Sequence, residues 1–444
     1  AEELGISRTT ANLAYELLRE DGLVVAHVGQ GTFVRATRPP AAAQPTPSYA
    51  WGGLVASRMA ALDLSSLAAS MRPKLEVPFD FRGGRVDPKL LPARALRQHF
   101  AQAFGDAALA ELANEVDPLG WPALRQHIAG SLLARGLRCS ANQVVVTSGA
   151  QAGLDLMARV LVEPGDVVAM EEPGYFGARL AFRAAEAEVL GVPVDSQGLV
   201  VDVLARLLRR RRIKLLYVTP AVQSPTGARL SAARREALLA LAAEHQVPIL
   251  EDDYDNELRH SEEPVTALAS HTGPASVLYV GTFSKALFPA LRLGYVVVPE
   301  ELTPTVAAAQ LVAQFAPSAM MQSGLCSLLT DESLARHVRR VRAVYAERIE
   351  RLLAKASTSF PSGTELRRPA GGNQVWVRLP RGVDGSHLHA RALEEGIAYA
   401  PGKLFFCGTP SYDALSLSVA HIDGDTLEEG IARLGALAES LCTT

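Results

Sequence analysis

GTFSKALFPALRLGY, residues 281–295, is the most informative segment of the chain. It follows an apolar, strand-like run, and Lys285 lies in its Thr- and Ser-rich turn. An amine forms a Schiff base with a carbonyl compound when its surroundings lower its pKa. Thr282 and Ser284 offer hydroxyl groups to a phosphate, and Arg292 offers a bidentate guanidinium to the same phosphate. The segment predicts a lysine that holds a phosphorylated carbonyl compound, with a surface lysine in a loop as the alternative.

A second segment, EDDYDNE at residues 251–257, comes directly after another strand-like run. Pyridoxal chemistry needs a carboxylate at the pyridine nitrogen, because the protonated ring then works as an electron sink. Asp252 is the candidate carboxylate, and Tyr254 is a candidate hydrogen-bond partner of the ring's phenolic oxygen. Consecutive acids also suit a solvated turn. Against that interpretation, ligands bind at the carboxyl ends of strands in open α/β sheets.

A third segment, VTSGAQAGLDLMARVLV at residues 146–162, is typical of a strand, a small-residue turn and a helix. The backbone N–H groups of Gly149, Ala150 and Gln151 would point at an anion there, and the helix dipole would favour its negative charge. A simple tight turn is the alternative.

Two more segments add an aromatic ring and a hydroxyl group. EEPGYFGAR, residues 171–179, places Tyr175 after a Pro-Gly turn, where it would stack on a cofactor ring or belong to the core. TPAVQSPTG, residues 219–227, is similar to the Asn-Pro-Thr-Gly turn of aminotransferases. Ser224 stands where an asparagine usually contacts the ring oxygen, so the sequence leaves that contact open.

The arrangement of these segments predicts an α/β domain. Short apolar runs alternate with amphipathic helical patterns such as residues 231–245, which favours a mostly parallel sheet covered on both faces. After about residue 315 a long charged helical pattern is followed by strands and helices in α+β style, which indicates a smaller C-terminal subdomain. The predicted strands are residues 144–147, 167–170, 214–220, 247–252 and 277–283.

The five segments, in this order and each at the end of a predicted strand, resemble fold type I pyridoxal-phosphate enzymes, the aspartate aminotransferase superfamily. The resemblance spans about residues 79–440. It implies pyridoxal 5'-phosphate as the cofactor, Lys285 as its anchor, and a homodimer with the cofactor near the subunit interface.

The N-terminal residues predict a winged helix-turn-helix. AEELGIS reads as the end of one helix and a turn, and Ser7 is a good N-cap for a second helix whose first turn holds Arg8, Thr9 and Thr10. Two strand-like runs flank a tight turn and suit a β-hairpin wing. A plain packing module is the alternative. The turn consists of Gly29, Gln30 and Gly31.

This N-terminal stretch resembles the DNA-binding domain of GntR-type bacterial regulators, without that family's first helix, so we expect it to be truncated. Together with the aminotransferase-like part it is similar to the MocR/GabR subfamily. We therefore expect a DNA-binding domain at residues 1–37, a Pro- and Ala-rich linker at residues 38–78 and the cofactor-binding domain at residues 79–444. The resemblance implies double-stranded operator DNA as a partner and Ser7 to Thr10 with Gly29 to Gly31 as DNA contacts.

Composition narrows the class of protein. The chain has 444 residues and a net charge of −3, which gives no general attraction to nucleic acid or anionic membranes. No apolar run is long enough for a transmembrane helix. Four scattered cysteines predict neither a metal site nor a disulfide framework and suit the cytoplasm. Two basic stretches, residues 209–214 and 337–342, are expected to be solvated helix faces, with DNA contact as a secondary hypothesis.

One position departs from the superfamily. Aminotransferases usually carry an arginine near the C-terminus that binds the substrate α-carboxylate, and Ser416 takes its place in ALSLSVAH. Either the ligand lacks that carboxylate or another cation binds it. The candidate cations are Arg179, Arg378 and Lys403, and the candidate neutral groups are Asn373 and Gln374.

Three functions are compatible with these observations. The first is a transcriptional regulator in which an amine effector displaces Lys285 from the cofactor by forming an external aldimine and alters operator affinity. The second is a working aminotransferase in which Lys285 is the general base. The third is a sensor of pyridoxal phosphate itself.

Overall fold

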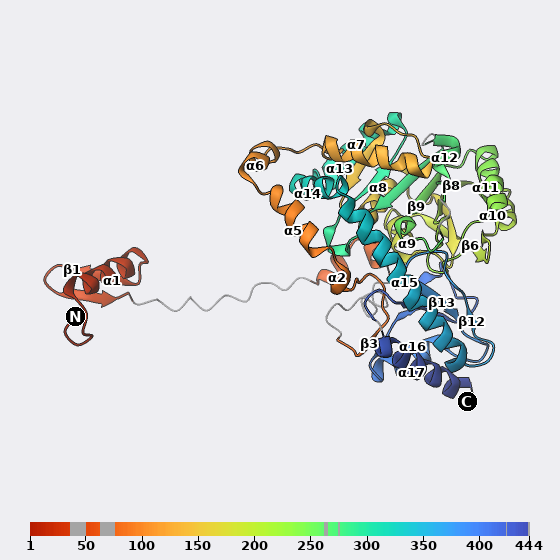
Figure 1. The fold of residues 1–444 in the computed structure, drawn as a ribbon. Helices are drawn as coiled ribbons and strands as arrows, with labels where there is room; N and C mark the ends of the chain where they lie inside the picture. The colour runs from red at the N-terminus through yellow and green to blue at the C-terminus, as the bar shows by residue number, and fades with distance from the viewer. Residues whose placement is uncertain (36–49, 63–75, 262–264, 274–275, 423, 443–444) are drawn as a thin grey trace. The chain divides into compact units, whose positions relative to one another are not determined.

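The structure is a computed structural model that describes residues 1–35, 50–62, 76–261, 265–273, 276–422 and 424–442. It divides into two compact units, residues 1–55 and 56–444 (Figure 1). The predicted linker lies for the most part outside the described residues. Its described part holds two short helices, α2 (Trp51–Leu54) and α3 (Ser57–Ala60).

The first unit contains a capped helix and a hairpin. The helix α1 (Arg8–Glu20) begins after Ser7, whose hydroxyl accepts the N–H of Thr10 at 3.1 Å. The strands β1 (Val24–His27) and β2 (Gly31–Val34) pair in antiparallel fashion. The predicted helix start and hairpin are therefore both present.

The first residues of this unit differ from the prediction. Residues 2–5 form a turn, in which the Gly5 N–H donates to the Glu2 carbonyl at 3.3 Å, and not the end of a helix. Gly5 has a φ of +62°, a left-handed conformation that suits glycine and ends helical geometry.

The second unit is built on an eight-stranded sheet with the order β4-β11-β10-β9-β8-β5-β6-β7. The central pairs are parallel, whereas β11 runs antiparallel to both of its neighbours and β7 antiparallel to β6. The strands are β4 (Val144–Thr147), β5 (Val167–Glu172), β6 (Glu188–Asp195), β7 (Gly198–Leu199), β8 (Ile213–Val218), β9 (Ile249–Asp253), β10 (Val277–Thr282) and β11 (Gly294–Val297).

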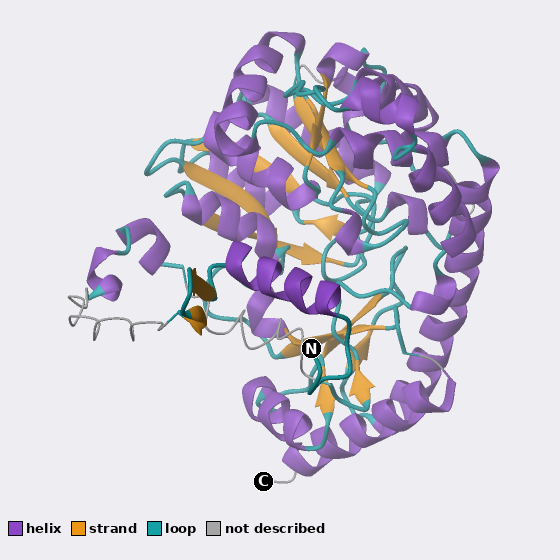
Figure 2. Cartoon of the chain, turned by 90° about the vertical axis from the view of Figure 1, so that its left-hand side faces the viewer, coloured by secondary structure: helices purple, strands orange, loops and turns teal. Residues whose placement is uncertain are grey.

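Helices cover both faces of this sheet (Figures 1 and 2). Strand β4 illustrates the alternation, because Val144 and Val146 belong to one buried cluster with Leu124 while Val145 belongs to another with Leu154. The helices of this layer are α5 (Ala93–Gln102), α6 (Asp106–Leu112), α7 (Pro122–Leu132), α8 (Ala150–Leu161), α9 (Phe176–Ala184), α10 (Val201–Leu208), α11 (Ala232–Glu244), α12 (Ala269–Thr272), α13 (Thr303–Gln314) and α14 (Ala319–Leu329).

A smaller four-stranded antiparallel sheet, β12-β13-β16-β15, forms the C-terminal subdomain with its own buried core. The predicted α/β fold class, with an aminotransferase-type large part and a smaller α+β part, is thereby confirmed. Its elements are β3 (Phe79–Asp80), α15 (Glu332–Ser359), β12 (Glu365–Leu366), β13 (Gln374–Arg378), α16 (Gly385–Glu394), β14 (Ile397–Ala398), β15 (Ala400–Pro401), β16 (Ala414–Ser418) and α17 (Gly424–Cys442).

The two basic stretches behave differently from each other. Arg209 caps the C-terminal end of α10, where a cation is favoured, and Arg211 pairs with Glu188 at the surface. In residues 337–342 the prediction of a solvated face is wrong for His337, which is buried with its Nε2 2.9 Å from the Ala286 carbonyl oxygen. Apolar spacing on α15 turns this histidine inward.

Candidate functional site

Lys285 and Asp252 lie at the carboxyl ends of two neighbouring parallel strands. In the register of β9 and β10, Asp252 lies opposite Val280, and Lys285 comes three residues after the end of β10. The Lys285 Nζ lies 5.7 Å from the centre of the Tyr254 ring. The carboxyl ends of these strands therefore bring together the amine, the carboxylate and the phenol, as expected for a ligand site in an open α/β sheet.

Asp252 has one hydrogen-bonded oxygen and one that lacks a described partner. Its Oδ2 accepts the Tyr217 hydroxyl at 2.8 Å, while Oδ1 is buried and has no hydrogen-bond partner among the described residues. Burial raises the pKa of this carboxyl to about 7, although Tyr217 and Lys285 oppose the rise. A positively charged N–H donor at Oδ1 would stabilise the ionised form.

The Tyr254 phenol lies beside the Ser224 hydroxyl, with which it shares a hydrogen bond. Burial raises the pKa of Tyr254 well above its ordinary value, so the phenol keeps its proton. The Ser224 backbone N–H in turn donates to the Thr219 hydroxyl oxygen at 3.0 Å. Serine therefore takes part in this hydrogen-bonded row without an asparagine.

The start of α8 and the Arg292 guanidinium form an anion cradle. A Cβ atom at Gly149 would lie 3.2 Å from that guanidinium, and one at Gly294 would lie 2.8 Å from the Ala150 nitrogen, so glycine is required for this close approach. Arg292 has a φ of +51° and donates to the Ser148 carbonyl at 2.9 Å. The N–H groups of Ala150 and Gln151 have no acceptor within the helix and are available to an anion. The Gly149 N–H, which was expected to join them, donates instead to the Thr147 carbonyl at 2.8 Å, so Gly149 contributes only its lack of a side chain.

Tyr175 is close enough to interact electrostatically with both Arg292 of the cradle and the Asp252 carboxylate. Its hydroxyl donates to the Gln151 side-chain oxygen at 3.2 Å, and that side chain donates to the Gly177 carbonyl at 2.9 Å. Burial raises the pKa of Tyr175 to about 12, with Asp252 adding to the rise and Arg292 opposing it. Gln151 therefore positions the tyrosine with its side chain, a role that the sequence did not predict.

Thr282 and Ser284 form the turn before Lys285. The Ser284 backbone N–H donates to the Thr282 hydroxyl oxygen at 3.1 Å. Both side chains are partly exposed, as is Lys285, so this turn presents polar groups at the open side of the site.

All the predicted cofactor residues thus lie in the second unit around the ends of β4, β5, β8, β9 and β10. The predicted DNA-contacting residues belong to the first unit, where Ser7 serves as the helix cap.

Sequence reasoning missed Tyr217 and Asp255. Tyr217 is a polar residue inside an apolar strand next to the acidic one, which is a usable signal. Asp255 is buried with its Oδ1 unpartnered among described residues, and its pKa is raised to about 6 by burial.

Aromatic residues form a wall that begins beside Ser416. Ser416 lies opposite Trp376 in the β13–β16 pair, so both side chains point to the same face. The Ser416 Oγ is buried without a partner among described residues. The Trp376 ring meets the Phe405 ring edge to face at 5.5 Å, and Phe405 meets Phe176 at 5.8 Å. Because Phe176 lies 5.3 Å from Tyr175, this aromatic row reaches the site.

The three candidate cations are mostly engaged or exposed. Arg179 donates to the Leu404 carbonyl at 2.9 Å, and burial lowers its pKa. Arg378 lies 4.3 Å above the Tyr412 ring, and Lys403 is exposed on its helical turn. Each of the two neutral candidates has a close neighbour of its own. The Asn373 side-chain oxygen accepts the Ser418 hydroxyl at 3.3 Å, and the Gln374 amide lies so close to Gly83 that a Cβ atom there would collide with it.

The residues present fit a cofactor with a carbonyl, a pyridine nitrogen and a phosphate. The unpartnered Asp252 oxygen suits the pyridine nitrogen, and the glycine-lined cradle beside Arg292 suits the phosphate. Comparison with known proteins agrees. Residues 87–434 match the family described as aminotransferase class I and II, for which pyridoxal phosphate is the indicated cofactor.

Two relatives match the chain almost throughout. A protein named "Probable rhizopine catabolism regulatory protein MocR", from Rhizobium meliloti, is 34% identical over 98% of this chain and 87% of its own length. A protein named "HTH-type transcriptional regulator TauR", from Rhodobacter capsulatus, is 34% identical over 98% of this chain and 89% of its own length.

A solved structure resembles the second unit. LysN, an alpha-aminoadipate aminotransferase from Thermus thermophilus complexed with N-(5'-phosphopyridoxyl)-L-leucine, superposes with a TM-score of 0.81 at 30% identity, covering 89% of this chain and all of that one. Fold and site therefore define an aminotransferase-type domain that uses pyridoxal phosphate. The chain belongs to the MocR/GabR subfamily of GntR-type transcriptional regulators.

Proposed function

We propose that this chain is a DNA-binding regulator that holds pyridoxal phosphate on Lys285 and responds to a small amine. One observation carries the proposal: a lysine, an unpartnered buried carboxylate oxygen of Asp252 and an anion cradle converge in a chain that matches two regulators nearly end to end. The match to regulators is what favours sensing over metabolism as the main role.

The cofactor, when bound, supplies a carbonyl carbon that exchanges between amines and a ring that withdraws electrons. Lys285 supplies the primary amine of the resting protein. Asp252, oriented by Tyr217, holds a proton at the ring nitrogen through its Oδ1. Tyr254 and Ser224 together orient the phenolic side of the ring. These residues keep one geometry whichever amine is attached.

The remaining predicted residues position the cofactor. Arg292 and the N–H groups of Ala150 and Gln151 bind the phosphate, with Thr282 and Ser284 adding hydroxyl groups and Gly149 leaving space for the close approach. Tyr175, whose orientation is fixed by the hydrogen bond of its hydroxyl to Gln151, would stack on a face of the ring. The Lys285 side chain lies close enough to two carboxyl groups, Asp252 and Asp255, to lower their pKa values, so these groups would hold it if an incoming amine took its place.

The first unit is proposed to contact double-stranded operator DNA through the first turn of α1 and the hairpin turn. Arg8, Thr9 and Thr10 stand at the start of α1, and the turn contains Gly29, Gln30 and Gly31. We further propose a homodimer in the cytoplasm, since operator half-sites are commonly read by two-fold symmetric proteins.

The aromatic row narrows the effector. Ser416 offers a hydroxyl and not a guanidinium, and the buried Trp376 lies beside it on the same face of the sheet. A carboxylate next to the amine would meet this apolar wall without a cation, at a desolvation cost. An amine without an α-carboxylate is therefore the favoured effector class.

A second candidate function is transamination. It is favoured by the completeness of the group around Lys285 and by the likeness to LysN. In that case Lys285 would move a proton between the carbon and the nitrogen of the substrate. A sensor of pyridoxal phosphate alone would need neither the proton transfer nor an effector pocket.

Operator binding by purified protein, with and without amines, tests the proposal. Wild type is expected to change its operator affinity when at least one of a series of small primary amines is added, and Lys285→Ala is expected not to respond. Identical binding by both proteins across all amines and cofactor concentrations would refute it. Keto-acid production by wild type without any effect on operator binding would favour transamination instead.

A further inference from the structure

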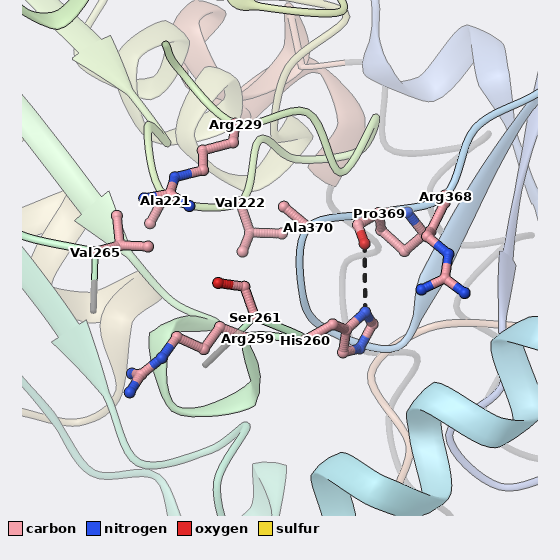
Figure 3. A pocket seen from close by; sticks show the side chains of 10 residues that line it. All are labelled: Ala221, Val222, Arg229, Arg259, His260, Ser261, Val265, Arg368, Pro369 and Ala370. Carbon is pink, nitrogen blue, oxygen red and sulfur yellow. Dashed lines mark hydrogen bonds between the residues drawn. The ribbon is translucent and has the colours of Figure 1, made fainter. Parts of the chain in front are cut away.

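A pocket of about 210 Å³ lies behind three loops of the Lys285 site. Figure 3 shows its lining, which combines small apolar side chains with basic ones. Its volume exceeds the roughly 150 Å³ of a cavity that holds benzene, so a small organic molecule fits. The lining residues are Ala221, Val222, Arg229, Arg259, His260, Ser261, Val265, Arg368, Pro369 and Ala370.

The pocket carries an excess of positive charge. No carboxylate is among its described lining residues. Arg368 pairs with Glu350 outside the lining, whereas no ion pair to a described carboxylate is found for Arg229 or Arg259. The Nε of Arg259 is buried without a described hydrogen-bond partner. Glu262 and Glu263 follow in the sequence but lie outside the described residues. In the view of Figure 3 the Arg229 and Arg259 guanidinium groups lie above and below Val265.

Backbone hydrogen bonds fix the three loops to one another beside this pocket. The Ala370 N–H donates to the Gly227 carbonyl at 2.8 Å, and the Ala370 carbonyl accepts the His260 N–H at 3.0 Å. The Gly372 N–H donates to the Leu258 carbonyl at 2.9 Å. The same loops carry Ser224, Tyr254 and Asn373 toward the cofactor site, so a ligand in the pocket contacts the frame of that site.

His260 gives the pocket a means of responding to an anion. Its Nε2 lies 2.9 Å from the Gly372 carbonyl oxygen and its Nδ1 lies 3.3 Å from the Pro369 carbonyl oxygen (Figure 3). A neutral imidazole has one N–H, so only the protonated ring donates both bonds. Burial lowers the pKa of His260, and a nearby anion would oppose that effect. An anion would thereby tighten the loop at residues 369–372.

We propose that this pocket is a second binding site, for a small carboxylate with an apolar body, and that its occupancy is coupled to amine exchange at Lys285. The carboxylate lies between Arg229 and Arg259, and the body packs on Ala221, Val222 and Val265. Tight binding needs contacts with both the apolar side chains and the two arginines. Inorganic anions and neutral apolar molecules each make only one of these contacts and should therefore bind more weakly.

Calorimetry with benzoate on the full chain loaded with pyridoxal phosphate tests the site. Benzoate is expected to bind at least tenfold more tightly than benzyl alcohol or sulfate, which carry only the body or only the charge. Arg229→Gln and Arg259→Gln are each expected to weaken benzoate binding at least tenfold. Arg210→Gln, an exposed arginine outside the lining, serves as the matched control and should bind like wild type.

The visible absorbance of the bound cofactor shows whether each variant is folded, so a loss of benzoate binding can be distinguished from a failure to fold. If benzyl alcohol binds as tightly as benzoate, if benzoate does not bind wild type, or if both pocket variants bind it normally, the site is refuted. Should one variant lose the absorbance band, the other decides.

The coupling is tested by amine titration with and without benzoate, and this part rests on the proposed function. Saturating benzoate is expected to shift the half-saturating amine concentration, and the amine should shift the benzoate affinity by the same factor. Benzoate binding without any such shift would retain the site and refute the coupling. If none of the amines produces a spectral change, the proposed amine response is refuted instead.

Discussion

The Lys285 site and the Ser416 wall lie in the same unit and each has a buried polar atom without a described partner, but the side chains around that atom differ. Around Lys285, hydrogen bonds hold the buried polar side chains in place and leave one oxygen, Asp252 Oδ1, free to accept a further hydrogen bond. Around Ser416, aromatic rings fill the space and the buried hydroxyl finds no described partner. Cofactor chemistry and carboxylate recognition are therefore separable parts of this fold.

Removing the amine should have the largest effect on this comparison. Lys285→Ala is expected to abolish covalent attachment and the visible absorbance of the bound cofactor, because no other described lysine lies at the site. Lys403→Ala, an exposed lysine of the small subdomain, is the control and should absorb normally. An undiminished band in Lys285→Ala would assign the anchor to another residue.

Asp252→Asn should weaken cofactor binding without removing it. A hydrogen bond to a charged partner contributes about 1.5–3 kcal/mol, so affinity is expected to fall roughly 10- to 150-fold. Equilibrium dialysis measures the change, and Asp155→Asn, at an exposed ion pair on α8, is the control. Equal affinity in both variants would mean that the open oxygen does not face the cofactor.

The pH dependence of loading should carry the signature of the same carboxyl. Burial raises the pKa of Asp252 from 3.8 to about 7, so in the empty protein its contribution to stability is present below about pH 4 and is lost as pH rises through about 7. A cationic ring nitrogen would remove that loss. The stability gained on loading should therefore grow between pH 5 and 8.

Comparison with Asp252→Asn isolates the effect of this carboxyl from that of every other titrating group. Thermal unfolding of empty and loaded protein across that range is the measurement, and the growth should be smaller in the variant than in wild type. The same slope in both proteins would contradict the assignment. Glu171 and Glu251, each with a pKa raised to about 7 by burial, are present in both states and cancel.

The smallest effect is expected at the aromatic wall. Ser416→Ala removes a buried hydroxyl that has no described partner, so the free energy of unfolding should change by less than about 1 kcal/mol. Cofactor absorbance and amine response should stay as in wild type. Urea unfolding checks the first point, and a loss of more than about 2 kcal/mol would show that the hydroxyl is satisfied after all.

Local motifs made part of this site predictable from the sequence. Lys285, Asp252 and the Gly149 turn stand at strand ends, and Ser7 precedes an apolar helix face, so each follows from its own neighbours in the chain. Tyr217 needed the pairing of β8 with β9, and the meeting of Ser416 with Trp376 needed the register of β13 and β16. Those contacts join residues far apart in sequence, and the register of strand pairing cannot be predicted from a single sequence.

The inward turn of His337 has the same origin. Its neighbours look like a basic surface, and only the packing of α15 against the Lys285 turn decides which side is buried. Gln151 was expected to contribute its backbone, and the structure adds its side chain as the partner of Tyr175. Pairwise contacts of this kind were beyond pattern reasoning, whereas the order of strands and helices was within it.

The aromatic row from Tyr175 to Trp376 also makes the protein a natural optical reporter. The chain has three tryptophans, and Trp376 is linked by successive ring contacts to the tyrosine proposed to cover the cofactor. A pyridoxal ring absorbs light where tryptophan emits, so excitation energy passes between them over so short a path. Occupancy of the site could then be followed by fluorescence quenching in the unlabelled protein, at concentrations too low for absorbance.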